Sequence, residues 1–402
     1  MNELGGRSGR GPSGAHPLAG VRVIDLTTNM SGPLATQVLA DQGADVIKVE
    51  PPAGDLIRTV GTGRAGMSAY FANLNRGKRS IAVNIAVPAG RQLVERLSST
   101  ADVFVQNFRM GVAERLGLGP DVVCAANPRL VYTSISGFGP TGPLAAAPAY
   151  DHVVQALSGF AALQSEGREP ALVRQGVVDK ATAYSTAQAI TAALLARATT
   201  GRGARVEVSM LDVAVAFIWP DGMMNHTCAD PDEVLPPVSR SFRVTPTADG
   251  HVSLVTLTAR QWGALVDAIL DGEAERPDLT ATGARMTAGG AIMRRVRAKL
   301  ATLPTAEVVE RLAAADVPCA PVVALDAVPA HPQVAASGAV LAVDHTVLGA
   351  VHRARPAPRF DGVPSPVPPW APRLGEHTDQ ILREAGLQEA EITELRTAGT
   401  VG

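Results

Sequence analysis

Between about residues 17 and 140, short β-branched runs alternate with segments of helical spacing. Strand-like runs occupy 21–26, 45–50, 80–85, 102–107 and 129–137, and helical segments lie between them except at 51–79, which is loop-rich. Strands that alternate with helices in this way normally lie parallel in one sheet, joined by right-handed crossovers. The repetition predicts an α/β fold with an open, mostly parallel sheet covered on both faces.

The later parts of the chain differ in character. Residues 181–198 are its longest strong helix former, and one more strand follows. From about residue 220 turn residues crowd together, a hairpin is expected around Asp249–Gly250, and helical segments fill roughly 260–315.

These changes predict a domain organisation. We expect a disordered tail at 1–16, a large domain beginning at 17–219, a smaller α+β domain at 220–325, and a linker and return segment at 326–402.

Composition excludes several classes of function. Lys and Arg number 36 against 38 Asp and Glu, so the chain lacks the general charge that attracts nucleic acid or an anionic membrane. The three cysteines lie far apart and indicate neither a disulfide framework nor a zinc site. No secretion signal or membrane-spanning run is visible, which favours a cytoplasmic protein.

Common catalytic motifs are absent. The glycines at 61, 63 and 66 have the spacing of a dinucleotide loop, but no strand precedes them and no convincing helix follows. The sequence contains no GxSxG, no HExxH and no P-loop. The usual hydrolase, metalloprotease and nucleotide readings therefore lose their support.

Basic residues cluster near the ends of the expected strands. Arg76, Lys78 and Arg79 precede one strand, whereas Arg109 and Arg115 follow another. Loops at the carboxyl ends of parallel strands form the ligand crevice, and the sequence Asn107-Phe108-Arg109 lies at such an end. These arginines could hold phosphates, or they could be solvated surface charges.

Asp179 is the most informative carboxylate. It follows a short apolar run at the expected N-cap of the long helix, and Asp is a preferred N-cap residue. A carboxylate at a helix N-terminus that faces a crevice could also attack a carbonyl carbon. Both roles stay open. His152 and Asp151 are adjacent on a helix, so they do not face one another as a dyad.

The ordered set of motifs resembles the family III CoA-transferases, which include formyl-CoA:oxalate transferase, carnitine CoA-transferases and 2-methylacyl-CoA racemases. The matching pieces are PLAGVRVIDLT with SGP, GADVIKVE with GD, NRGKRSIAVN, ADVFVQNFRMGVAERLGL, NPRLVYTSISGFGPTGP, PAYDHVVQALSG, VVDKATAYSTAQAITAALLA, TGRGARVEVSM, VPCAPV and PRLGEHTDQIL. They span about residues 17–390.

The resemblance implies a large Rossmann-like domain made from both ends of the chain, a smaller domain, and two ring-like subunits interlocked in a homodimer. It implies acyl-CoA and carboxylic acid substrates, with coenzyme A as the bound cofactor and no metal. Asp179 falls on the position of the catalytic aspartate. CoA contacts transfer to Asn107, Phe108, Arg109, Arg115, Val83, Asn84, Met30, Ser31 and Tyr150.

The expected reaction is the transfer of CoA through a covalent aspartyl-acyl anhydride and an aspartyl-CoA thioester on Asp179. The racemase branch carries a histidine in a GHD motif, and that position is Tyr150 here. This departure favours transfer over racemisation. An enzyme acting at the α-carbon and a non-catalytic CoA-binding homologue stay as alternatives.

Overall fold

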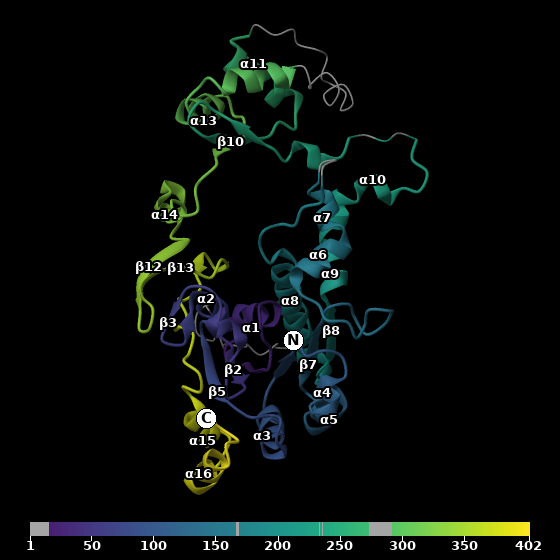
Figure 1. Cartoon of the computed structure of the whole chain (residues 1–402), viewed down its shortest axis with the longest axis vertical. Helices are drawn as coiled ribbons and strands as arrows, with labels where there is room; N and C mark the ends of the chain where they lie inside the picture. The colour runs from purple at the N-terminus through teal and green to yellow at the C-terminus, as the bar shows by residue number, and fades with distance from the viewer. Residues whose placement is uncertain (1–15, 166–168, 233, 235, 273–291) are drawn as a thin grey trace, which may run out of the picture. The chain divides into compact units, whose positions relative to one another are not determined.

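A computed structural model describes residues 16–165, 169–232, 234, 236–272 and 292–402 (Figure 1). The chain divides into two compact units. The larger comprises Met1–Gln164, Pro170–Phe217 and Ala335–Gly402, and the smaller comprises Ser165–Glu169 and Ile218–Val334. The predicted tail lies, except for His16, outside the described residues. The domain limits expected from the sequence stay a prediction.

The larger unit is built on a six-stranded parallel sheet. In chain order its strands are β1 (Arg22–Asp25), β2 (Asp45–Glu50), β5 (Lys78–Ala82), β6 (Val103–Gln106), β7 (Val131–Ser136) and β8 (Arg205–Ser209). They lie in the order β5-β2-β1-β6-β7-β8, that of a doubly wound sheet. The α/β fold predicted from the sequence is confirmed. The strand order reverses between β1 and β6, where such sheets bind their ligands.

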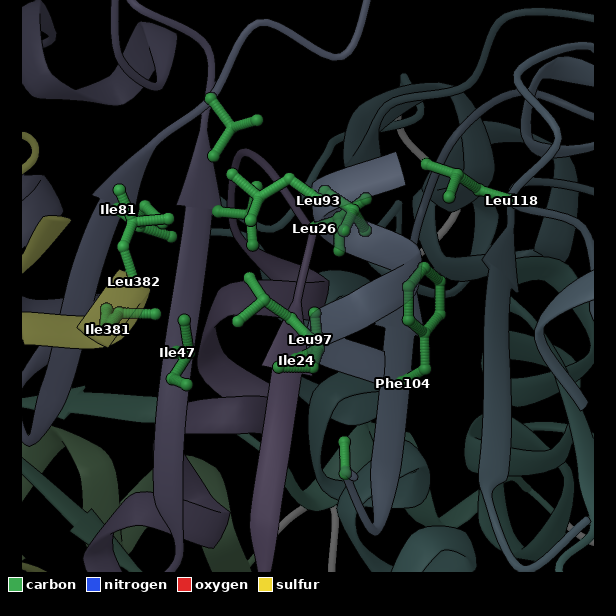
Figure 2. Close-up of a cluster of buried hydrophobic side chains, with 14 of the residues drawn as sticks. Ile24, Leu26, Ile47, Ile81, Leu93, Leu97, Phe104, Leu118, Ile381 and Leu382 are labelled. Carbon is green, nitrogen blue, oxygen red and sulfur yellow. The ribbon is translucent and has the colours of Figure 1, made fainter. Parts of the chain in front are cut away.

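One face of the sheet carries the main hydrophobic core. Figure 2 shows Ile24, Ile47 and Phe104 from the strands meeting the leucines of α3 (Pro88–Ser98). Helix α15 (Thr378–Glu384) adds Ile381 and Leu382 to the same cluster. Each fully buried side chain of this size contributes about 2 kcal/mol. Helix α15, near the end of the chain, and the first strands therefore share one hydrophobic core.

Two helices cover the opposite face of the sheet. Helix α1 (Ser31–Asp41) packs on β1 and β2, helix α8 (Val177–Thr200) packs on β7 and β8, and the two helices also pack on each other. The buried side chains of α8 include Thr182, Thr186 and Ile190, which recur every four residues. This spacing forms the stripe that α8 turns inward.

The smaller unit has its own sheet and core. Strand β9 (Val244–Pro246) and β10 (His251–Leu254) form the antiparallel hairpin predicted around Asp249–Gly250, and β11 (Cys319–Pro321) pairs with β10. Helices α11 (Ala259–Leu270) and α13 (Thr305–Ala314) pack their leucines and valines against it. The part of the predicted helical region at 273–291 lies outside the described residues.

The remaining elements are mostly short, but helix α9 has 13 residues and strands β12 and β13 have six residues each. They are η1 (Leu56–Thr59), β3 (Gly63–Arg64), β4 (Met67–Ser68), α2 (Ala69–Asn75), α4 (Val112–Arg115), α5 (Pro120–Ala126), α6 (Asp151–Ser158), α7 (Phe160–Leu163), α9 (Met210–Gly222), α10 (Met224–Thr227), η2 (Val238–Ser241), η3 (Val328–Ala330), α14 (Pro332–Ser337), β12 (Val340–His345), β13 (Gly349–Ala354), β14 (Arg359–Phe360), β15 (Val363–Pro364) and α16 (Glu389–Thr397).

Two local predictions are wrong. Strand β5 begins at Lys78, not at Ser80, so the expected basic turn is partly strand. Helix α8 begins at Val177 with Gly176 as its N-cap, which places Asp179 inside the first turn and not at the N-cap. The glycines at 61–66 lie at a small hairpin formed by β3 and β4, in agreement with rejecting a dinucleotide loop. The expectation that no helix follows them is wrong, because α2 begins at Ala69. Among the described residues, no helix has the length and apolarity needed to span a bilayer.

Candidate active site

A cleft with a cavity volume of about 170 Å³ opens at the carboxyl edge of the large sheet, beside the reversal between β1 and β6. Several residues predicted from the sequence line it together. They are Ser31, Asn107, Phe108, Arg109, Tyr150 and Asp179. The fold therefore brings residues far apart in sequence to one place.

Asp179 lies in the first turn of α8, where unpaired backbone N–H groups favour a negative charge. Its own backbone N–H donates to Oδ2 of Asp151, at 2.9 Å. The side chain of Asp151 therefore caps the start of α8 from another helix. This distant cap explains why α8 begins two residues before Asp179.

The carboxyl group of Asp179 is difficult to ionise. Burial, followed by the nearby negative charge of Asp151, raises its pKa from 3.8 to about 6. The hydroxyl and the backbone N–H of Ser31, the first residue of α1, act in the opposite direction and favour the ionised form. Asp179 is thus an ionisable group in a cleft whose pKa lies close to neutral pH, as is common in active sites.

Asp151 is buried at the start of α6 and is held in place. Its Oδ1 accepts from Nε2 of Gln155, one turn along the same helix. The amide of Gln155 also accepts from the N–H of Val173 at 2.9 Å and donates to the carbonyl of Gln175 at 3.2 Å. Helix α6 therefore holds the segment that leads into α8 and fixes the position of Asp179 in the first turn of that helix.

Asn107 joins the two sides of the strand reversal. Its Oδ1 accepts from the N–H of Thr28 at 3.0 Å, and its Nδ2 donates to the carbonyl of Thr28 at 2.9 Å. The loop after β6 is thereby tied to the loop after β1. The side-chain amide predicted to contact CoA is engaged mainly with the protein backbone.

Phe108 and Arg109 continue from Asn107 along the cleft. Phe108 is half-buried and packs against the main core, and its N–H donates to Gln106 at 2.7 Å. Arg109 is exposed, as is Arg115 at the end of α4. Within the described part of the chain, neither guanidinium has an ion-pair partner, so both remain available to an anionic ligand.

The lining of the cleft does not include three of the predicted contacts, Val83, Asn84 and Met30. Val83 is fully buried in the main core, and Asn84 follows it at the carboxyl end of β5. Met30 packs beside the cluster formed by α2 and Ala371. Their roles stay predictions. Tyr150, the N-cap of α6, is 56% exposed and lines the cleft.

The first basic cluster does not form an anion site. Arg76 pairs with Asp41 at 2.7 Å, and Lys78 is fully buried and pairs with Asp25 at 2.9 Å. Arg79 pairs with Asp45 at 2.7 Å. These charges are neutralised by carboxylates within the fold.

Sequence reasoning missed Tyr70 of α2. Burial, followed by the negative charges of Asp179 and Asp151, raises the pKa of its phenol group. Its hydroxyl therefore stays protonated near the carboxylates and can donate a hydrogen bond. The YF pair that opens α2 offered no local signal of this placement. In the ranges that the structure describes, no group of three or more His, Cys, Asp or Glu could hold a metal ion.

The chain was compared with known families and proteins. The sequence profile of CoA-transferase family III matches residues 18–378. The succinate–glutarate CoA-transferase of Agrobacterium fabrum is 34% identical over 399 residues, covering 95% of this chain and 99% of that protein. The formyl-CoA:oxalate CoA-transferase of Streptomyces coelicolor is 32% identical, covering 96% of this chain and 100% of that protein.

Solved structures show the same similarity. A CaiB/BaiF family protein from Brucella suis superposes with a TM-score of 0.80 at 31% identity, covering 92% of this chain and 100% of that one. The protein Rv3272 of Mycobacterium tuberculosis superposes with a TM-score of 0.79 at 31% identity, with the same coverage.

Proposed function

Because this chain belongs to CoA-transferase family III, we propose that it moves CoA from an acyl-CoA donor to a carboxylic acid acceptor, with Asp179 as the covalent nucleophile. The observation that carries the proposal is the setting of Asp179. It lines the ligand cleft of a doubly wound sheet, at the start of a helix, with a pKa of about 6. Such a carboxylate is ionised at neutral pH and more basic than an ordinary aspartate.

The first half of the reaction consumes the donor. A carboxylate oxygen of Asp179 attacks the thioester carbonyl, the carbon–sulfur bond breaks, and CoA leaves as a thiolate. The thiolate then attacks the aspartyl carbonyl of the mixed anhydride. The donor acid leaves, and Asp179 carries CoA as a thioester.

The second half reverses these steps with the acceptor. The acceptor carboxylate attacks the aspartyl thioester and expels the CoA thiolate, which then attacks the acceptor carbonyl. This restores the carboxylate of Asp179 and releases the new acyl-CoA. Because no water enters, the thioester bond is conserved in the product.

The surroundings of Asp179 suit this chemistry. The hydroxyl and N–H of Ser31 contact the carboxyl group of Asp179 and can stabilise its oxygen when the thiolate or the acceptor carboxylate attacks the aspartyl carbonyl. We assign the CoA phosphates to Arg109 and Arg115, whose guanidinium groups are exposed and unpaired within the described residues. Phe108 offers a ring at the same edge of the sheet.

A trapping experiment tests the nucleophile. Incubation with an acyl-CoA and hydroxylamine should convert Asp179 to a hydroxamate that peptide mass spectrometry locates. Asp179→Ala should abolish the adduct and leave CoA binding intact, whereas adduct formation elsewhere would sink the assignment. Incubating a 2-methylacyl-CoA in deuterated water tests the alternative, because α-exchange without acceptor acid would indicate a racemase.

The relatives guide the choice of substrates. Their names give succinate with glutarate, and formyl-CoA with oxalate. We propose that short acyl-CoA esters and small carboxylic acids are the substrates here. A matrix of succinyl-, acetyl- and formyl-CoA against succinate, glutarate and oxalate, read by mass spectrometry, identifies the pair.

We further propose that the chain forms an interlocked homodimer. Tyr184 and Leu195 are 58% and 74% exposed, although they belong to α8, the longest helix among the described residues. Large apolar side chains exposed in this way favour burial by a second copy. A monomeric mass by light scattering would contradict the proposal.

A further inference from the structure

The loop between β1 and α1, residues 27–31, carries Ser31 to the proposed nucleophile and is held by buried side chains. The N–H of Thr27 donates to Oδ1 of Asp25 at 2.9 Å. The carbonyl of Thr27 accepts from Nζ of Lys48, at 2.8 Å, and Lys48 lies on the neighbouring strand β2. The loop is thus fixed from outside its own sequence.

Lys48 forms an ion pair with Asp55 across 3.1 Å, and both side chains are 0% exposed. The second carboxylate oxygen of Asp55 accepts a hydrogen bond from the backbone N–H of Ile57 at 3.2 Å. The same oxygen lies 3.5 Å from the backbone nitrogen of Asn29. One ion pair therefore meets the loop at two points. Its cation holds the carbonyl of Thr27, and its anion faces the N–H of Asn29.

The loop needs such support because its path is tight. Asn29 has a φ of 64°, in the left-handed region that non-glycine residues seldom adopt. At Gly32 an added Cβ would lie 2.3 Å from Cβ of Thr27, so the chain folds back on itself with no room to spare. A backbone of this shape persists only where its surroundings enforce it.

Stability alone does not explain the pair. Taking two charges out of water costs about as much as their attraction returns, and apolar residues of similar volume often replace such pairs without loss. Beyond the pair, Lys48 donates to the carbonyl of Thr27 in this loop. Asp55 faces the N–H of Asn29 in the loop and also caps η1 through the N–H of Ile57. Placement of the loop is the property that apolar residues could not reproduce.

We infer that Lys48 and Asp55 are positioning residues for the transfer reaction, because their ion pair fixes residues 27–31 so that the N–H and hydroxyl of Ser31 meet the carboxylate of Asp179. The inference rests on the proposed function, since it takes Asp179 to be the nucleophile. Neither residue lines the cleft, so both act through the loop and not on the substrate.

Two variants and one matched control test the inference. Lys48→Met removes the ammonium group and keeps the length of the side chain. Lys48→Met/Asp55→Asn removes both charges and leaves no unpaired buried charge. It therefore tests the inference even if the single variant is unstable. The control is Arg76→Met, which loses a largely buried ion pair with Asp41, at the opposite end of α1.

The rate of acylation of Asp179 by succinyl-CoA is measured between pH 5 and 9 by rapid quench, with hydroxylamine to capture the acylated enzyme. CoA binding is measured by calorimetry, and Tm by circular dichroism. We expect the Lys48 variants to acylate about ten-fold more slowly at pH 6.5, the effect of one lost hydrogen bond to a charged group. The midpoint of their pH profile should move upward, because Ser31 favours the ionised form of Asp179. Their Kd for CoA should stay within about two-fold.

The outcomes separate the two proposals. If the wild type is labelled and the folded double variant keeps the wild-type rate and midpoint, the inference fails alone. It also fails if Arg76→Met shifts the profile equally, since loss of stability would then be the cause. If no donor in the matrix labels the wild type, the proposed function fails and the inference falls with it.

Discussion

Replacing Asp179 by asparagine should make the folded chain more stable at neutral pH. The carboxyl group has a pKa of about 6 in the fold, against 3.8 unperturbed, because burial and the charge of Asp151 disfavour ionisation. One pH unit corresponds to 1.36 kcal/mol, so keeping the group ionised at pH 7.5 costs about 3 kcal/mol. Asp179→Asn removes that cost and keeps the shape of the side chain.

The gain should depend on pH in a defined direction. Between pH 3.8 and about pH 6 the folded state holds the proton and the unfolded state does not, so the folding penalty from Asp179 grows as the pH rises through this window. The penalty is complete above pH 6 and absent below 3.8. At pH 5 the variant should gain about half of its advantage at pH 7.5. Loss of the interaction with Ser31 makes about 3 kcal/mol an upper bound.

Thermal unfolding of wild type and variant at pH 5 and pH 7.5 measures this gain. We expect the Tm of the variant to exceed that of the wild type by roughly 5 °C at pH 7.5, and by clearly less at pH 5. Asp326→Asn, at an exposed position, is the control and should leave Tm unchanged. An equal gain at both pH values, or no gain at pH 7.5, would refute the reasoning.

Three further changes have expected outcomes. The rate of acylation should rise with pH through a midpoint near 6, measured by rapid quench. Asp151→Asn should move that midpoint to lower pH, because it removes the negative charge that raises the pKa of Asp179. An unmoved midpoint would contradict this effect of charge. Arg109→Ala should raise the Kd for CoA, measured by calorimetry, about ten-fold at low salt. The increase should be smaller at 0.5 M salt, because salt screens an exposed charge. An unchanged Kd would exclude Arg109 from the CoA site. Gly32→Ala should lower Tm, at a cost of about 2 kcal/mol, because its Cβ would lie 2.3 Å from that of Thr27. Gly263→Ala, in an open helical position, should not lower Tm, and equal losses would show that the crowding is irrelevant.

Short-range patterns in the sequence predicted much of the sheet. The runs VRVIDL, DVIKVE and DVFVQN each became a strand within one or two residues, because β-branched residues buried on both faces suit a parallel sheet. The hairpin of β12 and β13 was missed, although two alternating runs flank its turn. Both strands lie within the segment predicted as a linker and return.

The errors at the site have a common physical cause, which is partners distant in sequence. The basic cluster Arg76, Lys78 and Arg79 suggested solvated surface charges, but Lys78 is buried and pairs with Asp25, on the strand two places away in the sheet. The start of α8 was misplaced because its cap is Asp151, which lies 28 residues earlier. No local pattern contains this information.

The return of the chain to its first sheet has a consequence for how the protein is made. The N–H of Ala82 lies 3.4 Å from the hydroxyl of Thr378, 296 residues later, and the N–H of Gly402 donates to the carbonyl of the same Ala82. A growing chain on the ribosome therefore cannot close this edge until its final helices emerge. The smaller unit is almost continuous in sequence and can fold first. Until then β5 remains an uncovered edge strand, and an uncovered edge can pair with another chain.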